Sequence, residues 1–111
     1  LNVHEGPQAI SRGNNVKLKE GMIVSNEPGY YESGKFGIRI ENLVAVKRVK
    51  NSYKFESLTL APIDKTLIQK ELLNSSEIEW LNNYHSKVYY NLKKYMNKAE
   101  LIGLKNSCSN I

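Results

Sequence analysis

The chain has 111 residues, 41% hydrophobic and 24% charged, a composition typical of one globular domain with a modest core. No apolar run reaches the roughly 20 residues of a membrane span, and no signal-peptide pattern opens the chain, so we expect a cytoplasmic protein without a membrane partner. The formal charge is +5, but the lysines are dispersed, so nucleic-acid binding is not expected. The single cysteine, Cys108, excludes an internal disulfide and fits a reducing compartment.

The first part of the chain is predicted to form strands. Residues 22–25 and 38–46, the latter continuing to about residue 49, are rich in β-branched and apolar side chains and predict two strands. The glycines and the proline between them permit a chain reversal. A third strand is predicted over residues 53–60, and it stops before Pro62.

From Asp64 the pattern becomes helical, and a short helix is predicted over residues 65–72. Asn74 and the serines after it form a capping cluster that opens one long amphipathic helix. Its apolar stripe recurs at spacings of three and four residues and consists of Ile78, Leu81, His85, Val88, Leu92, Tyr95 and Ala99. Gly103 is expected to end the helical region, and residues 106–111 to be frayed. The order predicts an α+β fold, an antiparallel hairpin sheet covered by a long C-terminal helix.

Two glutamates flank the predicted chain reversal. Glu27 and Glu41 each lie seven residues from Gly34, so a hairpin centred on Gly34 opposes them with Cβ atoms roughly 5 Å apart. Like charges in that position repel, and a shared proton, a basic neighbour or a metal would offset the repulsion. Arg39 falls on the same strand face as Glu41. A bulge would shift this register, and on pattern alone two solvated surface glutamates are the favoured interpretation.

The chain has two histidines. His4 stands next to Glu5 just before a Gly-Pro stop, and it is either a general acid–base group or an ordinary loop histidine. His85 lies on the apolar stripe of the long helix, which favours a packed and hydrogen-bonded structural residue over a ligand. The near-terminal Cys108 is expected to be inert.

Several motifs occur together in one order. They are VHEGP at residues 3–7, GMIVSNEPGYY at 21–31, FGIRIEN at 36–42, LTLAPI at 58–63 and WLNNYH at 80–85. In this order and spacing the chain resembles the C-terminal part of an Xaa-Pro aminopeptidase (aminopeptidase P), a member of metallopeptidase family M24. The resemblance extends over nearly all of the chain, to the middle of the long helix.

The resemblance implies a pita-bread fold, with residues 1–63 as the C-terminal half of the catalytic domain and residues 64–111 as a family-specific helical region. It implies two divalent metal ions (manganese, with zinc or cobalt as alternatives) held by two aspartates, one histidine and two glutamates. Glu27 and Glu41 match the two ligand glutamates, and Glu27 would also help to activate the metal-bound water. Arg39 matches an arginine beside the metals. His4 matches a histidine that binds substrate and stabilises the transition state.

The same resemblance places the other three metal ligands before Leu1. The start at Leu1 would be explained by a fragment, a processed product or a non-standard start codon. We therefore expect a piece of an enzyme that removes an N-terminal residue preceding proline, with a proline-containing peptide as the substrate of the intact enzyme and no activity in this chain alone. The alternatives are a half-enzyme complemented by a separately encoded N-terminal piece, or a non-catalytic remnant whose unpaired sheet edge makes it an interaction module and a possible homo-oligomer.

Overall fold

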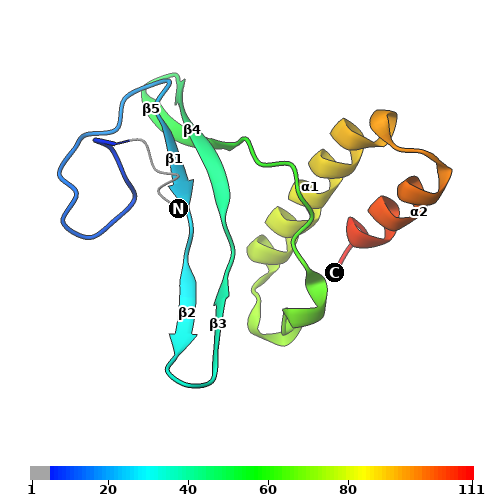
Figure 1. The fold of residues 1–111 in the computed structure, drawn as a ribbon. Helices are drawn as coiled ribbons and strands as arrows, with labels where there is room; N and C mark the ends of the chain where they lie inside the picture. Colours follow the sequence, from blue (N-terminus) through cyan, green and yellow to red (C-terminus); the bar gives the residue numbers. More distant parts are fainter. Residues whose placement is uncertain (1–5) are drawn as a thin grey trace. The chain divides into compact units, whose positions relative to one another are not determined.

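The computed structural model describes residues 6–111 and divides the chain into two compact units, Leu1–Thr59 and Leu60–Ile111. In the described residues the strands lie in the first unit and the helices in the second, so the expected α+β class is confirmed (Figure 1). Among residues 6–111, no helix combines the length and the apolar character that crossing a bilayer requires.

The first unit contains two antiparallel ladders. A three-stranded sheet has the order β1-β4-β5, formed by β1 (Ile23–Asn26), β4 (Asn42–Val49) and β5 (Ser52–Ser57). A two-stranded ribbon consists of β2 (Gly29–Glu32) and β3 (Phe36–Arg39). Because β1 runs on into β2 and β3 runs on into β4, the two ladders form one long hairpin (Figure 1).

The register of this hairpin is the one expected for a turn centred on Gly34. Ile23 pairs with Ala45 in the sheet and Glu32 pairs with Phe36 in the ribbon, and the partners in each pair are equally far from Gly34. Gly34 itself has φ +71°, a left-handed conformation that favours glycine. The same register therefore continues from the sheet through the ribbon, and no bulge displaces it.

One strand expected to be continuous is interrupted. The predicted strand over residues 38–46 splits into β3 and β4, with Ile40 and Glu41 between them. The Ile40 N–H donates to the Pro28 carbonyl at 3.2 Å, but Pro28 has no N–H to return the bond. The Pro28–Ile40 pair, next to the two glutamates, therefore has one backbone hydrogen bond where a regular ladder has two.

The third strand is shorter than predicted, because β5 ends at Ser57 rather than at Leu60. The Leu58 N–H still donates to the Leu43 carbonyl, at 2.8 Å. The Leu43 N–H, however, donates to the Thr59 side-chain hydroxyl instead of to a main-chain carbonyl. A side-chain acceptor thus ends the main-chain ladder. On the sheet, Val24, Val44 and Val46 are buried, which matches the alternation expected of a half-buried sheet.

The second unit begins with two short 3-10 turns, η1 (Lys65–Leu67) and η2 (Lys70–Leu72). The single helix predicted over residues 65–72 is therefore wrong. Neither turn buries a residue, so no packed apolar face repays the cost of nucleating a longer helix.

The long helix is confirmed as α1 (Ser75–Leu92), and it opens at the predicted Asn74 cap with a capping box to Glu77. It ends earlier than expected, with η3 (Lys93–Tyr95) and a separate helix α2 (Lys98–Ser107) after it. Asn97 explains the break: its side chain accepts from the Glu100 N–H, and the Glu100 carboxylate accepts from the Asn97 N–H at 2.8 Å. Tyr95 and Ala99 therefore do not extend the α1 stripe, and Gly103 lies inside α2.

The core of the second unit gathers Tyr84 and Val88 from α1 with Cys108, packed against Leu60, Ile63, Tyr89, Leu92 and Leu104. His85 is fully buried, and its Nε2 accepts from the Ile63 N–H at 3.1 Å, so the expected structural role is confirmed. The expected fraying of residues 106–111 is wrong. Lys65 Nζ donates to the Asn106 and Ser109 carbonyls, and the Ile111 N–H donates to Asn82 Oδ1.

Candidate metal centre

The two glutamates of the hairpin lie at the junction between its two ladders. Asn26 pairs with Asn42 on one side of the junction, and Gly29 pairs with Arg39 on the other. A register that holds on both sides makes Glu27 and Glu41 opposed positions, as the sequence predicts. Glu27 is half-buried and Glu41 is exposed. The junction therefore brings two carboxylates to one face of the hairpin.

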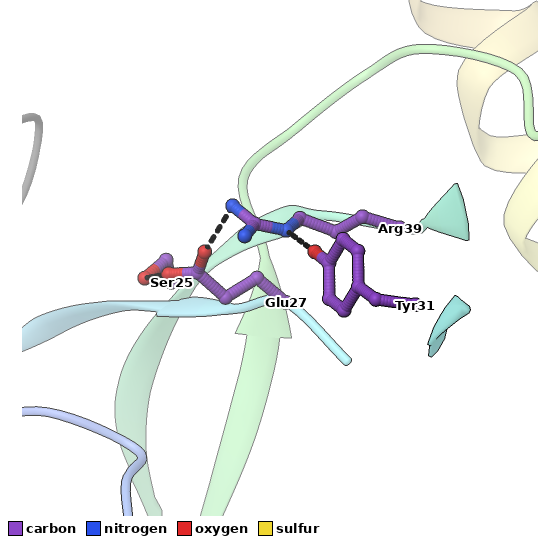
Figure 2. A network of polar contacts seen from close by, with 4 residues as sticks. All are labelled: Ser25, Glu27, Tyr31 and Arg39. Atoms are coloured by element: carbon purple, nitrogen blue, oxygen red, sulfur yellow. Dashed lines mark hydrogen bonds and ion pairs between the residues drawn. The ribbon is translucent and has the colours of Figure 1, made fainter. Parts of the chain in front are cut away.

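Each oxygen of the Glu27 carboxylate accepts a hydrogen bond (Figure 2). The Ser25 hydroxyl donates to Oε1 at 2.6 Å, and Arg39 Nη1 donates to Oε2 at 2.8 Å. Ser25 belongs to β1 and Arg39 to β3, so the two donors reach the carboxylate from the sheet and from the ribbon. These contacts fix the orientation of Glu27 at the junction.

Arg39 supplies the positive charge that the pair of carboxylates requires. Its Nε donates to the Tyr31 hydroxyl at 2.7 Å, and its guanidinium carbon lies 5.8 Å from the centroid of the Tyr31 ring. The hydrogen bond to the Tyr31 hydroxyl, followed by the carboxylates of Glu27 and Glu41, raises the pKa of Arg39 above its usual value. The expected basic neighbour is thus a permanent cation near both glutamates.

Tyr31 is a part of this network that sequence reasoning missed. A Cβ atom on Gly29 would lie 2.6 Å from the Tyr31 hydroxyl, and one on Gly37 would lie 2.6 Å from Tyr31 Cδ1. The ring therefore lies flat across the ribbon because both positions lack a side chain. Counting every second residue from Glu27 places Gly29 and Tyr31 on the same face, so strand alternation was the available signal.

The side chains at the junction provide only some of the ligands that a divalent cation needs. Carboxylate oxygens are hard ligands, and each keeps a second lone pair after accepting one hydrogen bond, so Glu27 can retain its contacts and still bind a metal. Within residues 6–111, however, no group of three or more His, Cys, Asp and Glu side chains could hold a metal ion. The candidate His4 lies outside the described residues.

Family profiles identify the class of protein to which this hairpin belongs. The family described as "C-terminal region of peptidase_M24" matches residues 51–111, and "Metallopeptidase family M24" matches residues 1–48. The chain therefore belongs to the C-terminal region of peptidase family M24, as the sequence resemblance predicts.

Curated relatives narrow the likeness to one kind of aminopeptidase. The chain is 43% identical over 112 residues to the probable Xaa-Pro aminopeptidase P of Talaromyces marneffei, covering 91% of this chain and 17% of the relative. It is 52% identical over 100 residues to that of Coprinopsis cinerea, covering 80% and 16%. It is 50% identical over 99 residues to aminopeptidase P2 of Arabidopsis thaliana, covering 80% and 14%. The chain thus spans about one sixth of the length of the relatives it matches.

A solved structure extends the likeness to three dimensions. The X-prolyl aminopeptidase from Caenorhabditis elegans, described as a cytosolic enzyme with a di-nuclear active site, matches with a TM-score of 0.85 and 37% sequence identity. The match covers 100% of this chain and 20% of the worm enzyme. The fold of the chain is therefore that of the corresponding part of an aminopeptidase.

Proposed function

We propose that this chain supplies the two-glutamate part of the dinuclear metal centre of an Xaa-Pro aminopeptidase, with Glu27 and Glu41 as metal ligands. The opposed placement of the two carboxylates at the ladder junction carries the proposal. The names of the matched relatives and the di-nuclear site of the worm enzyme support it. The substrate class would be peptides with proline in the second position, and the location would be cytoplasmic.

The residues of the hairpin would have separate roles. Glu27 and Glu41 would bind the cations, for which we favour manganese over zinc or cobalt. When bound, two such ions act as Lewis acids toward a peptide carbonyl and the attacking water. Arg39 would hold Glu27 in place and limit the repulsion between the carboxylates, as its 2.8 Å bond to Glu27 indicates. His4 would bind substrate and stabilise the transition state, and this role rests on the family motif alone.

We further propose that the 111-residue chain alone does not turn over substrate. Two carboxylates without a third ligand among residues 6–111 should bind a cation weakly, with water at the remaining positions. Isothermal titration with manganese should give weak binding that Glu41→Gln abolishes. Turnover of an Xaa-Pro peptide by the purified chain, lost on Glu41→Gln, would show that the chain is an enzyme by itself.

A chimera tests the full proposal. The chain would replace the matching fifth of the Caenorhabditis elegans enzyme, to which it is similar over its whole length. We expect manganese-dependent cleavage of Xaa-Pro peptides, reduced at least about a hundred-fold by Glu27→Gln or Glu41→Gln. Glu32→Gln, on the same ribbon and away from the junction, is the matched control. If the chimera is active and neither junction variant reduces its activity, the metal assignment is wrong.

We also propose a second arrangement, in which a separate polypeptide supplies the metal ligands that residues 6–111 do not provide. Co-expression with an N-terminal piece that carries two aspartates and a histidine should then restore activity. Co-purification of the two pieces without metal-dependent cleavage would count against this arrangement.

A further inference from the structure

Strand β5 forms an edge of the three-stranded sheet, because the strand order is β1-β4-β5. Its aromatic side chains are exposed, with 58% of Tyr53 and 52% of Phe55 accessible to solvent. An exposed edge strand presents unpaired N–H and C=O groups to any second strand that fits. The outer edge of β5 is therefore a candidate interaction surface.

The hydrogen bonds of β4 show which groups of β5 point outward. Val46 donates to the Met22 carbonyl at 2.8 Å and accepts from the Gly21 N–H at 2.9 Å, so its backbone groups face the β1 side. In an antiparallel sheet successive residues face alternate neighbours. The backbone N–H and C=O groups of Ala45 and Lys47 in β4 therefore point toward β5. Val46 pairs with Phe55 in the ladder, so the backbone N–H and C=O of Phe55 point away from β4, and those of Tyr53 do the same.

We propose that β5 pairs antiparallel with β5 of a second copy of this chain, with Phe55 opposite the partner subunit's Phe55. This register joins the outward N–H and C=O groups of Phe55 in two reciprocal hydrogen bonds. It also places Lys54 opposite the partner subunit's Glu56, and the two-fold axis repeats that pair.

Charge selects this register over its neighbours. Centring the pairing on Lys54 would oppose two lysines, and centring it on Glu56 would oppose two glutamates, both of which are unfavourable. Glu56 already contacts Lys47 of its own chain at 3.0 Å, and a carboxylate can accept from a second ammonium group. The proposal therefore does not require Glu56 to lose its present partner.

Charge reversal tests the pairing on the 111-residue chain. Sedimentation over about a hundred-fold range of protein concentration should show a reversible dimer. Lys54→Glu and Glu56→Lys should each weaken dimerisation at least about ten-fold, because each turns two attractive pairs into two repulsive ones. The double variant Lys54→Glu/Glu56→Lys restores opposite charges across the axis and should restore the dimer. Within one chain the carboxylate that Lys54→Glu introduces stands opposite Lys47, so β5 keeps a favourable partner on β4.

Lys17→Glu, which makes the same charge change at an exposed position outside the sheet, should leave the dimer unchanged. Circular dichroism of each variant distinguishes loss of pairing from loss of folding. A chain that stays monomeric throughout the concentration series would overturn the proposal. So would a dimer that both single reversals leave intact, or folded single variants whose weakness the double variant does not repair.

Discussion

Arg39 donates a hydrogen bond from Nη1 to Oε2 of Glu27 at 2.8 Å, although the two residues are 12 positions apart in the chain. The contact joins the β2–β3 ribbon to the junction of the hairpin, where the second glutamate also stands. It explains how the hairpin tolerates two opposed carboxylates, because a permanent cation at the end of β3 bonds one of them.

Arg39→Met is expected to lower the urea midpoint of unfolding only slightly, because the arginine side chain is 49% exposed and water screens the ion pair. The shift should shrink further at high salt. Urea denaturation at two salt concentrations measures it, with the exposed Arg12→Met as the matched control. A shift equal to that of the control would mean that Arg39 does not stabilise the hairpin.

Gly37→Ala should destabilise the hairpin by about 1–3 kcal/mol, because the new Cβ would overlap the Tyr31 ring. In a Tyr31→Ala background the same change should be neutral or slightly favourable, since the ring is gone and alanine suits a strand better than glycine. Urea denaturation of the four proteins in this double-mutant cycle gives the coupling free energy. Additive effects would show that Tyr31 does not require the missing side chain.

The second unit should lose stability as pH falls below about 6.5. Burial, then the charge of Lys65, lowers the pKa of His85 in the folded chain, so the unfolded chain binds a proton that the folded chain excludes. The loss can reach about 1.4 kcal/mol per pH unit until the folded pKa is passed, and it is absent above the unfolded pKa.

Chemical denaturation from about pH 7 to about pH 5 tests this dependence against His85→Gln, which cannot titrate. The pKa of Asp64 is also lowered, by hydrogen bonds from Thr66, but that group matters only below about pH 4. Equal pH slopes in the wild-type and His85→Gln chains would rule out His85 as the source.

Asn97→Ala should cost about 1 kcal/mol, because the Asn97 side chain accepts hydrogen bonds from the Ala99 and Glu100 N–H groups at the start of α2. Thermal unfolding followed by circular dichroism measures the loss. Asn83→Ala, at an exposed position inside α1, should instead be neutral or slightly stabilising. If the two variants behave alike, the capping box does not define the start of α2.

Local sequence signals determined the strand pairing of the hairpin and the position of the long helix. The turn at Gly34 and the alternation on either side of it were enough to predict the register that opposes Glu27 and Glu41, because turn geometry and a two-residue period fix strand pairing within a hairpin. The Asn74 cap and the apolar spacing likewise predicted α1, and the motif order predicted the family.

Tertiary structure decided which side chains meet. Neither the periodicity around Tyr31 nor that around Lys65 indicates that one ring would lie over two glycines, or that one ammonium group would bind the Asn106 and Ser109 carbonyls about 40 residues away. Periodicity and turn chemistry act over a few neighbouring residues, whereas these contacts depend on the packing of distant segments and of whole side chains. The sequence alone therefore placed two glutamates opposite each other with Arg39 on the same face, and only the folded ribbon showed that Tyr31 bonds Arg39 while Arg39 bonds Glu27.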